Sequence, residues 1–361
     1  MTNLEITNAY VGSDQISKLY LGGEAIWPST PPGPVYSAMP LTFEIISGGT
    51  IMWYSQQSNK VVEYQINDGN WTSITAGTGT SISVQEGDIV RFKGHNDAYG
   101  IPSNDPACTT FIGSGDTMAT AVFNVYGNIM SLIDGDNYQG LQFTNANIGA
   151  FVGLFHHFKP NSTDLPFNYS LQSAANLILP DNVVDNCYRG MFMMCDGLVD
   201  ASNLILPATT LAANCYNRMF SACLSLQAAP ALPATNLVDS CYYYMFRFST
   251  SLTTAPELPA TALASRCYYS MFEGCTSLTT APELPATALT SNCYRQMFSG
   301  CTNLNYIKCL ATSGINNTNL SSWVRGVQSY IGTFVKDANA YWPSGDNGIP
   351  AGWHIIDAVI S

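Results

Sequence analysis

The sequence predicts a multidomain chain with a short N-terminal β-hairpin module, an all-β sandwich and a long α/β solenoid closed by a C-terminal cap. The strongest observation is a repeat whose Cys-Tyr pairs begin at residues 187, 215, 241, 267 and 293. A fixed period of 26 to 28 residues is typical of a solenoid, because stacked units bury a face that no single unit can bury. Short alternating segments separated by turn residues precede it and predict the sandwich.

Residues 1–28 form the predicted N-terminal module. The segment from Tyr10 to Ile16 (Tyr-Val-Gly-Ser-Asp-Gln-Ile) returns as Tyr20 to Ile26 (Tyr-Leu-Gly-Gly-Glu-Ala-Ile), which predicts two short hairpins. So small a unit is not stable alone and is expected to dock on another protein. The anchoring candidates are Tyr10, Ile16, Tyr20, Ile26 and Trp27. Residues 29–37 follow as a Pro-rich linker.

The predicted sandwich covers residues 38–130. Segments such as Leu41 to Ile46 and Val61 to Ile66 alternate apolar and polar residues between turn signals such as Asp68-Gly69. Trp53 and Trp71 lie within this pattern, where tryptophans are usually core. Their alternative use is as a stacking platform for sugars.

Composition restricts the possible partners. Only 11% of residues are charged while 46% are hydrophobic, so the surface must be largely neutral and polar. The formal net charge of −12 argues against a nucleic-acid partner, which would require a basic stripe. We find no apolar run of about eighteen residues and therefore expect no membrane span. Met1 to Tyr10 do not resemble a secretory signal, which favours folding in the cytoplasm.

The repeats are predicted to occupy residues 131–325, with residues 326–361 as the cap. The pattern Cys-Tyr-x-x-Met-Phe-x-x-Cys places apolar residues at intervals of three and four, which predicts a short helix facing inward. The following Leu-x-x-Ala-Pro-x-Leu-Pro predicts a brief strand. Ala150 to Phe155 align with Cys187 to Phe192, which indicates a degenerate first unit carrying an insertion around 159–167. Trp342 and Trp353 are expected in the core of the cap.

Ten of the eleven cysteines lie at residue 187 or later. Most repeats carry two, eight residues apart, but the unit that begins at Cys241 has Ser249 in the second place. The total is odd, there is no Cys-x-x-Cys, and no histidine lies among the repeats, so neither a disulfide framework nor a zinc site is expected. We predict buried free thiols, no metal and no cofactor.

Strand, turn, short helix and return at a period of 26 residues resemble leucine-rich repeats. Met271-Phe272, Cys275 and Leu278 are similar to the core of the BspA-like subfamily, whose units carry Ala-Phe-x-x-Cys-x-x-Leu, with Met in place of the usual Ala. The resemblance covers roughly residues 150–325. It implies an α/β leucine-rich-repeat solenoid, of a kind found in surface and phage-borne proteins of gut anaerobes.

Positions that change between units are the candidate contact surface. They are rich in Tyr and Arg, the residues that dominate interface hot spots. Nothing in the sequence matches a catalytic motif, so we predict a non-enzymatic protein. The ligand-binding candidates are Tyr243, Tyr244, Arg247, Tyr269, Arg295, Arg218 and Arg189.

Two functions compete at this stage. In the first, the chain is a phage fibre or receptor-binding component, made in the host cytoplasm, because its N-terminal module resembles segments of phage tail and fibre proteins. It would bind other virion proteins through that module and a host-surface protein or glycan through the repeats, and it could form a homo-oligomer. In the second, it is a bacterial cell-surface adhesin of the BspA type. A carbohydrate-binding accessory module acting through Trp53 and Trp71 is a third, weaker alternative.

Overall fold

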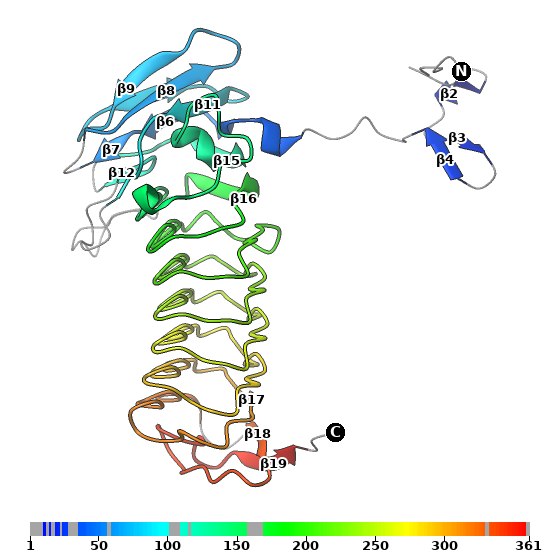
Figure 1. Ribbon diagram of the computed structural model, residues 1–361, viewed down its shortest axis with the longest axis vertical. Helices are drawn as coiled ribbons and strands as arrows, with labels where there is room; N and C mark the ends of the chain where they lie inside the picture. The colour runs from blue at the N-terminus through cyan, green and yellow to red at the C-terminus, as the bar shows by residue number, and fades with distance from the viewer. Residues whose placement is uncertain are drawn as a thin grey trace.

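The computed structural model describes residues 35–55, 59–100, 109–114, 117–156, 169–328 and 332–358, together with the backbone of four short strands near the N-terminus (Figure 1). Of those strands, β1 (Tyr10–Val11) pairs with β2 (Asp14–Gln15) and β3 (Leu19–Leu21) pairs with β4 (Glu24–Trp27), both antiparallel. The pairs fall on the residues where two hairpins were predicted. Ile16, the side chains of the other anchoring candidates and most of the linker lie outside the described residues.

A six-stranded sheet forms the larger layer of the N-terminal domain. Its order is β16-β15-β5-β11-β8-β9, and all neighbours are antiparallel except β15 and β16, which are parallel. The short helix η1 (Tyr36–Ala38) leads into it. The strands are β5 (Leu41–Ser47), β8 (Val61–Ile66), β9 (Thr72–Thr75), β11 (Ile89–Gly94), β15 (Val122–Asn128) and β16 (Leu171–Ile178).

Three two-stranded sheets complete this domain: β6 (Gly49–Met52) with β10 (Ser81–Val84), β7 (Tyr54–Ser55) with β12 (Thr109–Thr110), and β13 (Gly113–Ser114) with β14 (Thr117–Met118). The core is aromatic, with the Phe43 ring 4.6 Å from that of Phe123 and 5.0 Å from that of Phe111. Trp53 is fully buried and its Nε1 donates to the carbonyl of Lys60. Trp53 therefore has no free face on which a sugar could stack.

The N-terminal domain covers the first repeat. After β15 come η2 (Ile129–Leu132) and η3 (Asn145–Asn147), and the chain then enters a turn segment aligned with the next unit. The amide of Phe151 donates to the carbonyl of Cys187, and that of Phe155 to the carbonyl of Met191. One buried cluster runs from the N-terminal domain through every repeat. The N-terminal domain thus shields the end of the stack from water.

The repeats stack one on another, but they are not the predicted α/β units (Figure 1). Across the residues that the structure describes there is no α-helix, only short 3-10 helices, strands and turns. From 187 to 195, residues with odd numbers donate their amide to the carbonyl three residues earlier. Residues with even numbers donate to the next unit, as in Tyr188 to Cys215 and Phe192 to Met219. The prediction of an α/β leucine-rich-repeat solenoid is therefore wrong.

A four-residue period explains the error. Overlapping turns place a left-handed residue at every fourth position, as at Asn186, Gly190 and Met194, with φ near +60°. Cys187, Met191 and Cys195, at intervals of four residues, face inward. Tyr188 and Phe192, also four residues apart, face inward as well. Two inward columns with period four give the same spacing of three and four as an amphipathic helix. The apolar pattern alone does not distinguish them.

The predicted strand of each unit is reduced to isolated bridges where proline is present. Ala228 bridges Asp200 and Thr254 in parallel, and no ladder extends from these pairs because Pro230 and Pro256 lack an amide donor. Strands form in two segments without proline, as β16 and β17 (Tyr306–Cys309). The segment at Asp200 also has no proline, but it makes only a single bridge, to the unit that contains Pro230. β17 continues into a parallel sheet with β18 (Thr333–Asp337) and β19 (His354–Ala358).

Aromatic side chains form two stacks along the inside of the repeats. Neighbouring ring centroids lie 5.4 to 5.8 Å apart in the Phe stack and 5.7 to 6.1 Å apart in the Tyr stack. Trp323, which is fully buried, packs against the last ring of both stacks and against Trp342. The members are Phe155, Phe192, Phe220, Phe246, Phe272 and Phe298, and Tyr188, Tyr216, Tyr242, Tyr268 and Tyr294.

The second cysteine of each repeat has a structural role. The thiol of Cys223 donates to the carbonyl of Phe192, and the hydroxyl of Ser249 donates in the same way to Phe220. Serine can therefore replace cysteine at this position, because the interaction requires a small side chain with a donor. All ten described cysteines are free and buried.

Trp323→Ala should open the C-terminal end of the stack. Because Trp323 is buried against both aromatic stacks, its truncation is expected to cost about 3–5 kcal/mol of local stability. Hydrogen exchange of amides in residues 293–327 measures this, and Tyr341→Ala, at a side chain 84% exposed, is the control. Equal protection in the two variants would contradict the capping role of Trp323.

The buried thiols should make the stack sensitive to alkali. Burial raises the pKa of Cys187 and of Cys241 to about 12, whereas an unfolded thiol has a pKa of about 8.5. Since the folded pKa is the higher one, this stabilisation is complete below about pH 8.5 and is lost as pH rises toward 12. In that window each such thiol lowers the free energy of unfolding by up to about 1.4 kcal/mol per pH unit.

We expect the urea midpoint of unfolding to be flat from about pH 6 to 8 and to fall steeply above about pH 9. Cys241→Ala should make the free energy of unfolding depend less steeply on pH, by one proton released on unfolding, since the variant has one thiol fewer to titrate. A midpoint unchanged up to about pH 10.5 would show that the thiols ionise as freely in the folded state as in the unfolded one.

Candidate functional site

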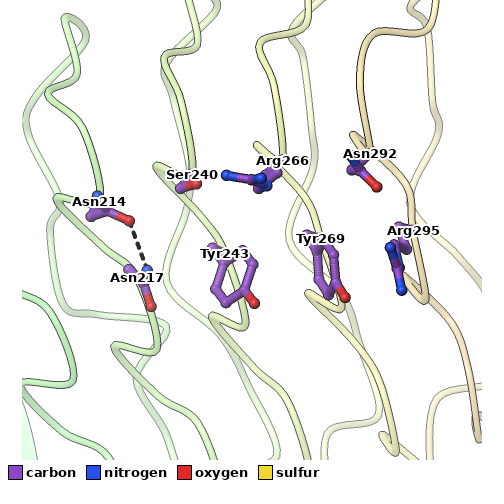
Figure 2. Close-up of a pocket in the computed structure, with 8 residues that line it drawn as sticks. All are labelled: Asn214, Asn217, Ser240, Tyr243, Arg266, Tyr269, Asn292 and Arg295. Carbon is purple, nitrogen blue, oxygen red and sulfur yellow. Dashed lines mark hydrogen bonds between the residues drawn. The ribbon is translucent and has the colours of Figure 1, made fainter. Parts of the chain in front are cut away.

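An open polar groove crosses four consecutive repeats, and each repeat contributes two residues to it (Figure 2). One row is made by the residue immediately before each Cys-Tyr pair, and the other by the residue two positions after that cysteine. The groove has a volume of about 410 Å³. Its first row is Asn214, Ser240, Arg266 and Asn292, and its second row is Asn217, Tyr243, Tyr269 and Arg295.

The turn geometry places these side chains. All four residues of the first row are left-handed, with φ between 53° and 57°. Backbone hydrogen bonds between units fix the register, so equivalent side chains lie one unit apart in a line. The rings of Tyr243 and Tyr269 are consequently neighbours, with centroids 4.8 Å apart and planes tilted by 32°. Both rings are partly exposed at the surface.

Hydrogen bonding in the groove leaves two shielded polar atoms without a partner. Asn217 donates from Nδ2 to Oδ1 of Asn214 at 2.9 Å, but its own Oδ1 has no partner, although the residue is only 7% exposed. At the opposite end, the guanidinium of Arg295 lies 5.5 Å from the ring centroid of Tyr269 and its Nε is also unpaired. Buried polar atoms are normally hydrogen-bonded, so both indicate places where a ligand could bind.

A second group of side chains, which we call the Tyr244 cluster, adjoins the groove. The guanidinium carbons of Arg218 and Arg247 lie 5.2 and 4.8 Å from the Tyr244 ring centroid. Arg247 also forms a two-pronged ion pair with Glu273, at 2.8 and 3.2 Å. Desolvation, reinforced by the hydroxyl of Tyr243, raises the pKa of Tyr244 to about 12. The Tyr244 and Tyr243 rings are 4.0 Å apart, which joins cluster and groove.

The structure brings most of the sequence-predicted residues together, though on turns rather than on a helix. Tyr243, Tyr269 and Arg295 line the groove, and Tyr244, Arg247 and Arg218 make up the cluster. Arg189 lies in the unit that begins at Cys187 and lines neither the groove nor the cluster. Sequence comparison of the units missed Asn214, Asn217, Ser240, Arg266 and Asn292 as site residues. For the four residues other than Asn217, the available signal was the column directly before each Cys-Tyr pair, which is polar in every unit. Asn217 occupies the same varying column as Tyr243 and Tyr269.

Other chemistries find no assembled site in the part of the chain that the structure describes. That part has no group of three or more His, Cys, Asp or Glu side chains placed to hold a metal ion. It also has no helix of sufficient length and apolar character to cross a membrane. Trp71 is half-buried beneath the ammonium of Lys93, which lies 4.5 Å from the ring centroid. With Trp53 in the core, the two tryptophans do not form a shared platform.

Comparisons with protein-family models, with curated proteins and with solved structures give no match to this chain. The resemblance of the repeats to the BspA-like subfamily therefore stays a prediction, while the fold that it implied is corrected above.

Proposed function

We propose that this chain is a non-enzymatic adhesion protein of a phage virion, held by its N-terminal module and binding the host surface through the groove and the Tyr244 cluster. The observation that carries the proposal is the regular array of outward Tyr, Arg and Asn side chains on an otherwise uniform stack. Tyrosine and arginine contribute strongly to interfaces because they bring large contact area and directional hydrogen bonds. The inner residues repeat almost unchanged, whereas the outer ones differ from unit to unit.

Rigidity supports this function. The outer side chains project from turns whose backbone amides are paired within and between units, and whose inner side chains are buried. A surface fixed in this way loses little conformational entropy when it binds. The N-terminal pairs β1–β2 and β3–β4 precede a Pro-rich segment, an order that suits an attachment module followed by a spacer.

Location and attachment can be tested separately. Antibody to residues 150–325 should label intact particles, and peptides of the chain should occur in purified virions. Labelling of uninfected bacteria with none on particles would instead favour a cell-surface adhesin and contradict the virion proposal.

Particles carrying Tyr243→Ser and Tyr269→Ser should adsorb to host cells at least about tenfold less well, which corresponds to a loss of about 1.4 kcal/mol. Tyr341→Ser, which removes a tyrosine 84% exposed in the C-terminal region, is the matched control and should adsorb normally. Unchanged adsorption of the double variant, with its fold intact by circular dichroism, would exclude this face as the attachment surface.

A further inference from the structure

We propose that the groove binds an acidic glycan, a saccharide chain with carboxylate groups that lies along the stack over Tyr243 and Tyr269. Its carboxylates would bind Arg266 and Arg295, which lie in neighbouring units. This inference rests on the proposed adhesion function and specifies the chemistry of its ligand.

Charge is the first reason. The chain has a formal net charge of −12, yet the eight lining residues include two arginines and no carboxylate. Arg247 in the adjoining cluster is neutralised by Glu273, whereas the described residues include no ion pair of Arg266 or Arg295. One carboxylate adjoins the groove, that of Asp239, whose Oδ1 accepts from Ser240 Oγ at 3.3 Å. With two arginines against this one carboxylate, the groove is still a small positive site on an acidic protein, and such a site attracts an anion.

The unpaired polar atoms give the second reason. Asn217 Oδ1 requires a donor and Arg295 Nε requires an acceptor, and they lie at opposite ends of the second row. A sugar hydroxyl can donate to the amide oxygen, and a carboxylate can accept from the guanidinium with a charge-assisted bond. One molecule with both groups would satisfy both atoms, which a simple anion cannot do.

The tyrosine pair gives the third reason. The rings of Tyr243 and Tyr269 pack against each other, with centroids 4.8 Å apart and planes tilted by 32°, and form an aromatic surface among polar side chains (Figure 2). A pyranose ring has an apolar face of C–H groups and a rim of hydroxyls, so its apolar face can pack on this aromatic surface while its rim meets Asn and Ser. Because the groove continues across four units, it can hold several sugar residues in a row.

Other macromolecules fit less well. None of the eight lining residues is aliphatic, and no strand edge runs along the groove, whereas peptide recognition generally uses apolar pockets or strand addition. Two arginines on an acidic chain are also too few for a phosphate backbone, which needs an extended basic stripe.

The test uses the full chain and surface polysaccharide purified from a bacterium to which the particles adsorb. Half of the polysaccharide is carboxyl-reduced, which converts its acidic sugars to neutral ones. We expect binding of the untreated polymer, weakening with added salt, and at least a tenfold lower affinity for the reduced polymer. Arg266→Gln with Arg295→Gln should lower affinity for the untreated polymer by a similar factor.

The control is Arg325→Gln, which removes the same charge at an exposed arginine outside the groove and should bind normally. Equal binding of native and reduced polymer, or full binding by the double variant, overturns the inference. If the chain binds no polysaccharide while adsorption still depends on Tyr243 and Tyr269, the adhesion function stands and its ligand is a protein. If adsorption is also independent of these tyrosines, the proposed function fails too.

Discussion

The hydrogen bonds that link each turn segment to the next repeat are the interaction on which the rest of the structure depends. They run from every second amide to a carbonyl in the next unit, for example from Tyr244 to Tyr269 at 3.0 Å. The intervening amides close turns within the unit, so the turn segments are paired without any helix. This pattern sets the register in which aromatic rings, thiols and surface side chains align.

This register divides the positions of the repeat into two sets, inner columns that stay nearly constant and outer columns that vary. Inner columns of Cys, Tyr, Met and Phe make stacks in which each ring contacts its equivalent in the neighbouring unit, so they change little. Outer columns are held in position by the backbone and are free to vary. The four units that line the groove show this, since Asn217, Tyr243, Tyr269 and Arg295 occupy one column with three different side chains.

The sequence predicted the repeat period and its buried residues, but not the backbone conformation. Intervals of three and four residues indicate an inward face, and this face can come from a helix or from turns with period four. The left-handed position before each Cys-Tyr pair was the distinguishing signal, because it holds Asn, a residue that favours this conformation, in three of five units (Asn186, Asn214 and Asn292). Four of the five missed groove residues, Asn214, Ser240, Arg266 and Asn292, directly precede a Cys-Tyr pair and so lie before the segment whose varying positions were compared between units.

Through-hydrogen-bond scalar couplings measured by NMR test this account most directly. The turn ladder predicts couplings from the amide nitrogens of Tyr242, Tyr244 and Phe246 to the carbonyl carbons of Cys267, Tyr269 and Met271. An α-helix would instead couple the amide of Phe246 to the carbonyl of Tyr242, four residues earlier in the same unit. Observation of the couplings between units supports the ladder, and observation of the helical couplings contradicts it.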